Sequence, residues 1–135
     1  MNEPVAKLLF TVPGPPVPKA RARTFAGPGG HVLTLTPRKT ARYERQVSAL
    51  ALLAVMTFLR RTGEHWPQHA AWFRLSCRFY AARDAGDLSN FVKTIEDAMN
   101  TIVWPDDRAV KRYGDMRLET DRVNPRAEIT VEAFA

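Results

Sequence analysis

The chain has 135 residues, a length that fits one globular domain with its own core. Its composition, with 45% hydrophobic and 25% charged residues, argues against disorder throughout the chain. Its formal net charge of +6 suits a polyanionic partner. The only cysteine, Cys77, excludes an intramolecular disulfide and a zinc site made of several thiolates, and with no secretory signal at the start we expect a cytoplasmic protein.

The N-terminal segment predicts a strand followed by a basic, proline-rich loop. Apolar residues alternate over positions 7–12, which is typical of a strand: Leu8, Phe10 and Val12. Four prolines between positions 13 and 18 prevent a regular hydrogen-bonded ladder, so we expect an extended loop there. Cations project from the far end of that loop, namely Lys19, Arg21 and Arg23.

Residues 23–25 and 31–36 flank a tip rich in glycine and predict two short strands. Thr36 followed by Pro37 then predicts a helix start, because a hydroxyl can cap the first turn and proline suits a position that needs no donor. Apolar residues recur at helical spacing after it: Tyr43, Val47, Leu50, Ala51, Ala54 and Phe58. The apolar run at 47–59 is too short to span a bilayer, so we expect no membrane contact.

The second half predicts a strand, a helix and two further strands. Alternation over residues 73–80 indicates a strand with one buried face. A helix follows, capped by Asp87 or Ser89 and ended by Trp104 and Pro105. Its apolar stripe consists of Phe91, Ile95, Ala98, Met99 and Ile102. Residues 108–118 and the segment around Ile129 and Val131 predict the last strands.

Carboxylates cluster around this second helix in an otherwise basic protein. Asn90, Lys93 and Asp97 are three and four residues apart, so they share a face away from the apolar stripe. Asp87 stands at the helix entrance, and an adjacent pair of acids follows the helix: Asp106 and Asp107. Mg²⁺ prefers oxygen ligands, and a polyanionic substrate needs cationic surroundings, so the pattern indicates a metal-dependent nuclease.

The same spacing also fits a purely structural role. Asp87 would then be a helix cap, Lys93 and Asp97 a surface ion pair, and the two later acids turn residues. Charge distribution is compatible with both interpretations. Residues 1–63 carry ten Lys and Arg against two Glu, whereas residues 64–135 carry ten against twelve acids. A basic half could bind phosphates or could simply be solvated.

At these residues the chain resembles the RusA family of Holliday junction resolvases. The family pattern has an Asp-x-Asp-Asn segment, then Lys, then Asp, then a paired Asp-Asp. In this chain the pattern maps onto Asp87, Ser89 and Asn90, then Lys93, Asp97, Asp106 and Asp107. The proline-rich loop with its basic end and the Thr-Pro helix start are also similar to the family, and the resemblance covers roughly residues 8–132.

The resemblance implies a small α+β fold over residues 1–135, with a mixed sheet packed by two main helices, and a homodimer. It implies paired symmetric nicking of four-way DNA junctions in recombination and repair, with Mg²⁺ as cofactor, Mn²⁺ as a substitute, and a bacterial or phage source. Asp87 and Asp107 are carried over as catalytic metal ligands, and Lys93 as the cation beside the scissile phosphate. Asp106, Asp97 and Asn90 are secondary candidates.

One position departs from the family pattern. Ser89 stands where the second acid is expected, which replaces a strong metal ligand with a neutral hydroxyl. Asp84 or Asp97 are candidates for the missing carboxylate. We therefore expect weakened metal-dependent nicking and keep two alternatives, a catalytically impaired junction-binding protein and a broader nuclease for flaps and other branched DNA.

The expected DNA-binding surface is basic and lies before the acidic motif. Phosphate contacts set affinity and depend on cations rather than on base sequence. The residues expected to make them are Lys19, Arg21, Arg23, Arg38, Lys39 and Arg42, together with Asn90 near the acids. Four cations in the first two turns of a helix oppose its macrodipole, which also indicates an anion to be bound there.

Overall fold

The computed structural model describes residues 3–20, 23–35, 37–84 and 86–135, with side chains at 23–25 and 32–35 left out. Of the predicted residues, Arg21 and Thr36 lie outside this set, as does the side chain of Arg23. Within the part of the chain that is described, no helix is both long and apolar enough to cross a membrane.

The described elements alternate between strands and helices along the chain. In order they are β1 (Ala6–Pro13), β2 (Arg23–Ala26), the 3-10 turn η1 (Pro28–Gly30), β3 (Val32–Leu35), α1 (Arg38–Thr62), β4 (Trp72–Ala81), α2 (Leu88–Met99), the 3-10 turn η2 (Asp107–Ala109), β5 (Val110–Thr120) and β6 (Arg126–Phe134). Each predicted strand and both predicted helices are present.

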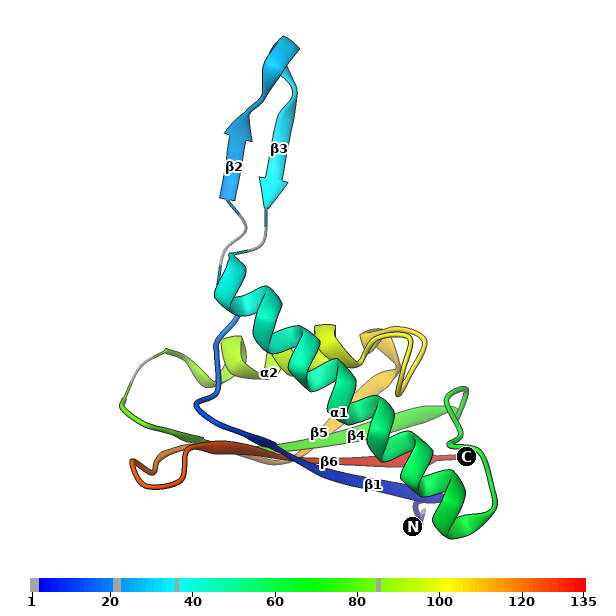
Figure 1. The fold of residues 1–135 in the computed structure, drawn as a ribbon. Coiled ribbons are helices and arrows are strands. Elements are labelled where there is room, and N and C mark those ends of the chain that lie inside the picture. The colour runs from blue at the N-terminus through cyan, green and yellow to red at the C-terminus, as the bar shows by residue number, and fades with distance from the viewer. Residues whose placement is uncertain (1–2, 21–22, 36, 85) are drawn as a thin grey trace.

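Four strands form one mixed sheet in the order β1-β6-β4-β5. β6 pairs antiparallel with β1 and with β4, while β4 and β5 are parallel and are joined through α2. The strands β2 and β3 form a separate antiparallel hairpin, which projects away from the sheet at the N-terminal end of α1 (Figure 1). The expected α+β fold with a mixed sheet and two helices is confirmed.

Both helices cover the same face of the four-stranded sheet (Figure 1). The alternating apolar residues of β4 point into this layer, and Phe73, Leu75, Cys77 and Phe79 are at most 1% exposed. From α1 the core receives Tyr43, Val47, Ala51 and Phe58. From α2 it receives Phe91, Ile95, Ala98 and Met99, whereas Ile102, the last residue of the predicted stripe, lies after the helix and is partly buried. The buried stripes of the two helices are therefore the surfaces that hold them on the sheet.

Two helix boundaries differ from the sequence predictions. The second helix ends at Met99, not at Trp104 and Pro105. Asn100 is extended and Thr101 has a positive φ of 70°, a conformation that a right-handed helix cannot continue. Trp104 turns back instead and donates from its indole Nε1 to Asn100 Oδ1 at 2.9 Å. At the other helix, Pro37 rather than Thr36 occupies the cap position.

A bulge in β5 determines which side chains face the helices. Leu75 pairs with Tyr113 and Cys77 with Met116, so Gly114 and Asp115 together oppose Ser76. The Asp115 N–H donates to Ser76 Oγ at 3.1 Å, and a Cβ on Gly114 would overlap that oxygen. Glycine at 114 thus permits a close approach that keeps both Tyr113 and Met116 on the helix-covered face.

This close approach predicts that Gly114→Ala destabilises the protein by about 1–3 kcal/mol, because the new methyl group overlaps the Ser76 hydroxyl. Thermal unfolding should show a lower midpoint for the single variant. Adding Ser76→Ala removes the overlapping oxygen and should restore part of the loss, giving a favourable coupling in a double-mutant cycle. If the two effects simply add, the overlap is not the cause.

Candidate active site

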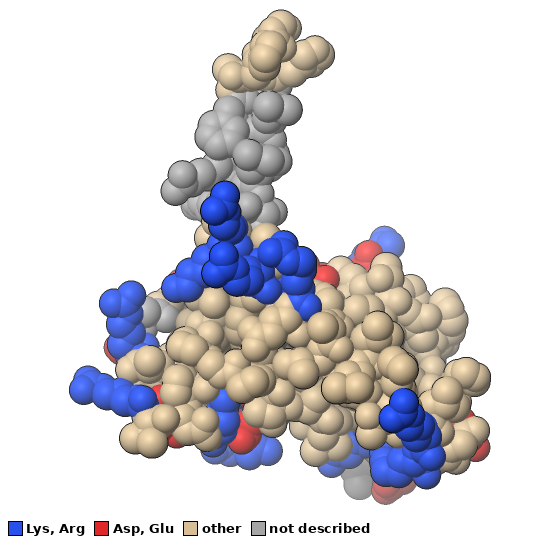
Figure 2. Space-filling view, in the orientation of Figure 1, with Lys and Arg blue, Asp and Glu red and all other residues tan. Residues whose placement is uncertain are grey.

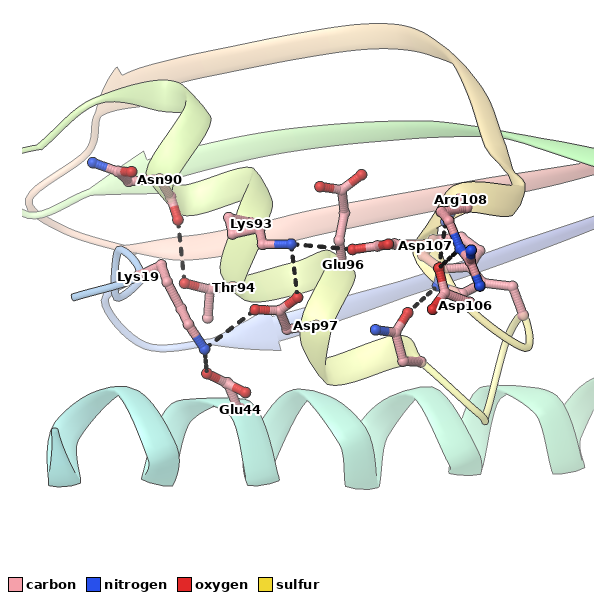
Figure 3. Close-up of polar contacts among 12 residues, drawn as sticks. Lys19, Glu44, Asn90, Lys93, Thr94, Glu96, Asp97, Asp106, Asp107 and Arg108 are labelled. Carbon is pink, nitrogen blue, oxygen red and sulfur yellow. Dashed lines mark hydrogen bonds and ion pairs between the residues drawn. The ribbon is translucent and has the colours of Figure 1, made fainter. Parts of the chain in front are cut away.

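The polar face of α2 carries the ion pairs at the centre of the candidate site (Figure 3). Lys93 Nζ lies 3.1 Å from Asp97 Oδ1 and 3.2 Å from Asp107 Oδ2. Hydrogen bonds to Asp97 and Asp107 hold the pKa of Lys93 above its usual value, so the ammonium group stays charged. Three predicted site residues from two segments of the chain are therefore in direct contact.

Asp97 also joins α2 to the proline-rich loop. Its second oxygen, Oδ2, lies 3.2 Å from Lys19 Nζ, which in turn donates to Glu44 Oε1 of α1 at 2.7 Å (Figure 3). Burial lowers the pKa of Lys19, but the hydrogen bonds to Glu44 and Asp97 outweigh burial and raise it overall. Lys19, predicted as a DNA contact, thus has two carboxylate partners inside the fold.

Asp106 lies beside Asp107 and caps the short turn η2. Its Oδ1 accepts from the Arg108 backbone N–H at 2.9 Å and from Arg108 Nε at 3.1 Å. The Arg108 backbone N–H, followed by its guanidinium, lowers the pKa of Asp106. This carboxylate therefore already has strong donors, whereas Asp107 faces Lys93.

Two residues of the site were missed by the sequence analysis. Glu96 of α2 is half-buried near Asp107 and accepts a hydrogen bond from Tyr113 Oη at 2.9 Å. Burial raises the pKa of Glu96, with Asp107 adding to the rise and the Tyr113 hydroxyl opposing it. Burial and the Glu96 contact together raise the pKa of Tyr113 to about 12. The three- and four-residue spacing around Lys93 does include Glu96, but its tyrosine partner depends on the β5 bulge.

The remaining predicted acid lies at the other end of α2. Asp87 occupies the N-cap position, yet its side chain makes no capping hydrogen bond, and Ser89 and Asn90 are exposed in the first turn. Positions 87 and 93 are six residues apart, which is roughly 9 Å along the helix axis. The structure thus brings together Lys93, Asp97, Asp106 and Asp107, while Asp87, Ser89 and Asn90 form a second group.

The carboxylates suit a metal ion only in an open arrangement. Among the described residues, no group of three or more His, Cys, Asp or Glu side chains is arranged to hold a metal. Mg²⁺, however, is commonly held by one or two carboxylates and completed by waters and substrate phosphates. The Asp107 carboxylate, beside Lys93, suits that open mode, whereas the described residues do not form a closed protein cage.

A basic surface lies next to the acids. Figure 2 shows lysine and arginine side chains gathered at the base of the β2–β3 hairpin, over the N-terminal end of α1. Arg38, Lys39 and Arg42 are exposed in the first turns of this helix and form no ion pair with a described residue. Lys19 connects this end of α1 to the acidic face through Glu44 and Asp97.

Comparison with known families gives one match over most of the chain. A family model described as Endodeoxyribonuclease RusA matches residues 13–132, which includes both groups of acids and the basic end of α1. No curated protein matches the chain.

The raised pKa of Glu96 predicts a pH-dependent effect of Glu96→Gln. Because the folded protein binds this proton more tightly than the unfolded chain, the stabilisation is present at low pH and is lost as the pH rises through the folded-state pKa. Glutamine keeps an oxygen for Tyr113 but carries no charge. We expect the variant to melt slightly above the wild type at about pH 7.5, with no gain near pH 4, roughly the ordinary glutamate value. Glu64→Gln, at an exposed position, is the control, and its melting temperature relative to the wild type should not differ between the two pH values.

Proposed function

Because the chain belongs to the RusA family of endodeoxyribonucleases, which are Holliday junction resolvases of DNA recombination, we propose that it nicks four-way DNA junctions in a metal-dependent reaction. We propose that one domain, residues 1–135, carries the site and that two copies act as a homodimer. A two-fold dimer presents two identical sites, which is what two symmetric nicks require.

The observation that carries this proposal is the contact of Lys93 with both Asp97 and Asp107. Two carboxylates keep the ammonium group charged and in place at the edge of an acidic cluster. A fixed cation beside a scissile phosphate stabilises the negative charge that develops on its oxygens during cleavage. Lys93 is therefore proposed as the catalytic cation, and Asp97 as the residue that positions it.

Asp87 and Asp107 are the proposed metal ligands, with Asp106, Asp97 and Ser89 as further oxygen donors. When bound, Mg²⁺, or Mn²⁺ in its place, lowers the pKa of a bound water and neutralises charge on the phosphate. Asp106 is held by Arg108 and would orient its neighbour Asp107. The DNA itself is expected to complete the coordination with phosphate oxygens.

The proposed DNA-binding surface is the basic end of α1 together with the adjoining hairpin. Arg38, Lys39 and Arg42 would bind backbone phosphates, and Arg21 and Arg23 would extend the contact. Lys19 lies where this surface meets the acids, and Asn90 is exposed on the first turn of α2. We place the activity, in recombination and repair, in the cytoplasm of a bacterial or phage-infected cell, where such DNA lies.

Ser89 favours a second candidate function. A neutral hydroxyl in the place of the family's second acid weakens metal binding, so the protein would bind the junction without nicking it efficiently.

Cleavage of a synthetic mobile four-way junction, beside linear duplex and flap controls, separates these functions. Paired symmetric nicks in Mg²⁺ but not in chelator support the resolvase. Binding without nicks supports the second candidate, and equal cleavage of flaps indicates a broader nuclease.

We expect Asp107→Asn to reduce junction nicking by at least on the order of 100-fold, since even residues that only orient a metal ligand commonly cost 10–100-fold. Rates are measured on the four-way junction at saturating Mg²⁺. Asp115→Asn is the matched control, because Asp115 pairs with Arg78 and Arg117, away from the site. Equal rates for Asp107→Asn and wild type would remove Asp107 from the metal site.

Ser89→Asp is expected to increase nicking and to lower the Mg²⁺ concentration needed for half-maximal rate, because it restores an anionic oxygen ligand at the family position. Ser89→Asn has a similar size without the charge and serves as the control. An unchanged metal requirement in Ser89→Asp would show that position 89 is not the weak ligand.

A further inference from the structure

A groove of about 410 Å³ lies between the proline-rich loop, the first turn of α1 and the loop that follows β4. Its base is formed by Pro16 and Phe91, which are buried, and its walls carry ring surface from Pro15 and Pro18. Two exposed cations line it from different elements, Lys39 from α1 and Arg83 from the loop after β4. An apolar floor with cations beside it is distinct from the ion pairs around Lys93.

The groove ends next to the proposed metal ligand Asp87. Phe91 lies one helical turn after Asp87, and its backbone N–H donates to the Asp87 carbonyl at 3.3 Å. Gly86, with a φ of +89°, packs so closely on Phe91 and Pro18 that a Cβ there would lie 3.1 Å and 3.5 Å from their rings. Gly86, the residue before Asp87, therefore packs against two residues that line the groove.

The side chains that line the groove suit a single nucleotide in size and charge. Neither Lys39 nor Arg83 forms an ion pair with a described residue, so both are available to a phosphate. Proline rings and aliphatic surface can pack against the face of any base, as apolar side chains do where proteins unstack DNA. The volume falls in the range of small-ligand sites and is too small for a paired duplex segment.

We infer that this groove binds a single unpaired nucleotide at a DNA branch, with its base against the proline-lined floor and its phosphate between Lys39 and Arg83. The inference rests on the proposed function, which supplies DNA as the partner. A nucleotide in a linear duplex must first be unpaired and unstacked, at a cost of a few kcal/mol, whereas one at a branch is already exposed. The groove, which lies next to Asp87, therefore favours the binding of branched DNA over linear DNA.

The test uses a four-way junction carrying one unpaired 2-aminopurine nucleotide at its branch, compared with the fully paired junction, both in chelator so that no strand is cut. We expect wild type to bind the unpaired form about tenfold more tightly, the size of one base-packing contact. The 2-aminopurine fluorescence reports whether that base enters the protein. Arg83→Ala should remove most of this preference and lower the salt slope by about one unit.

Ala82→Trp fills the groove without changing its charge, and it should remove the preference while keeping the salt slope. Arg60→Ala, in the last turn of α1, is the matched loss of an exposed arginine and should keep both. Melting curves of all three variants are measured alongside, and only variants that melt cooperatively, as the wild type does, enter the comparison.

The outcomes separate this inference from the proposed function. If wild type shows no preference, or if Arg83→Ala and Ala82→Trp both retain it, the inference is overturned even when the paired junction is nicked normally in Mg²⁺. If the preference depends on both positions but no junction is nicked, the groove stands as a nucleotide site and only the proposed enzymatic function fails.

Discussion

The burial of one face of α2 determines where the site residues of this helix point. Phe91, Ile95 and Met99 are at most 2% exposed, and the Phe91 ring lies 5.4 Å from that of Phe79 in β4. With this stripe held against the sheet, Lys93 and Asp97 have to face away from it, because residues three and four apart on a helix share a side. The chemistry of the site thus depends on hydrophobic packing that contains no charged group.

Ion pairs then connect this helix to the rest of the fold. Asp97 binds Lys93 with one oxygen and Lys19 with the other, so the proline-rich loop, α1 and α2 meet at a single carboxylate. Lys93 in turn reaches Asp107, which arrives from the segment after α2. These side chains are only partly buried, so we attribute to them the positioning of groups rather than a large share of stability. Stability comes from the apolar layer beneath.

Acidic and basic side chains occupy different parts of the surface. The acids lie along the polar face of α2 and on η2, whereas cations that pair with no described residue collect at the N-terminal end of α1 (Figures 2 and 3). A polyanion held by the cations would bring its phosphates to the acids, where a divalent ion can bridge carboxylate and phosphate. The two surfaces lie side by side because α1 and α2 pack against each other on the same face of the sheet (Figure 1).

The sequence by itself determined the elements, because hydrophobic spacing in β4, α1 and α2 reflects the local geometry of strands and helices. It also indicated that Asn90, Lys93 and Asp97 share a face. Only the tertiary structure decided that Asp107 meets Lys93, that Lys19 is paired within the fold, and that α2 stops at Met99. The Glu96–Tyr113 contact likewise depends on a bulge at Gly114. Such contacts join residues that are distant in the chain. Hydrophobic periodicity predicts single helices and strands, but it does not predict how the chain turns back to bring those residues together.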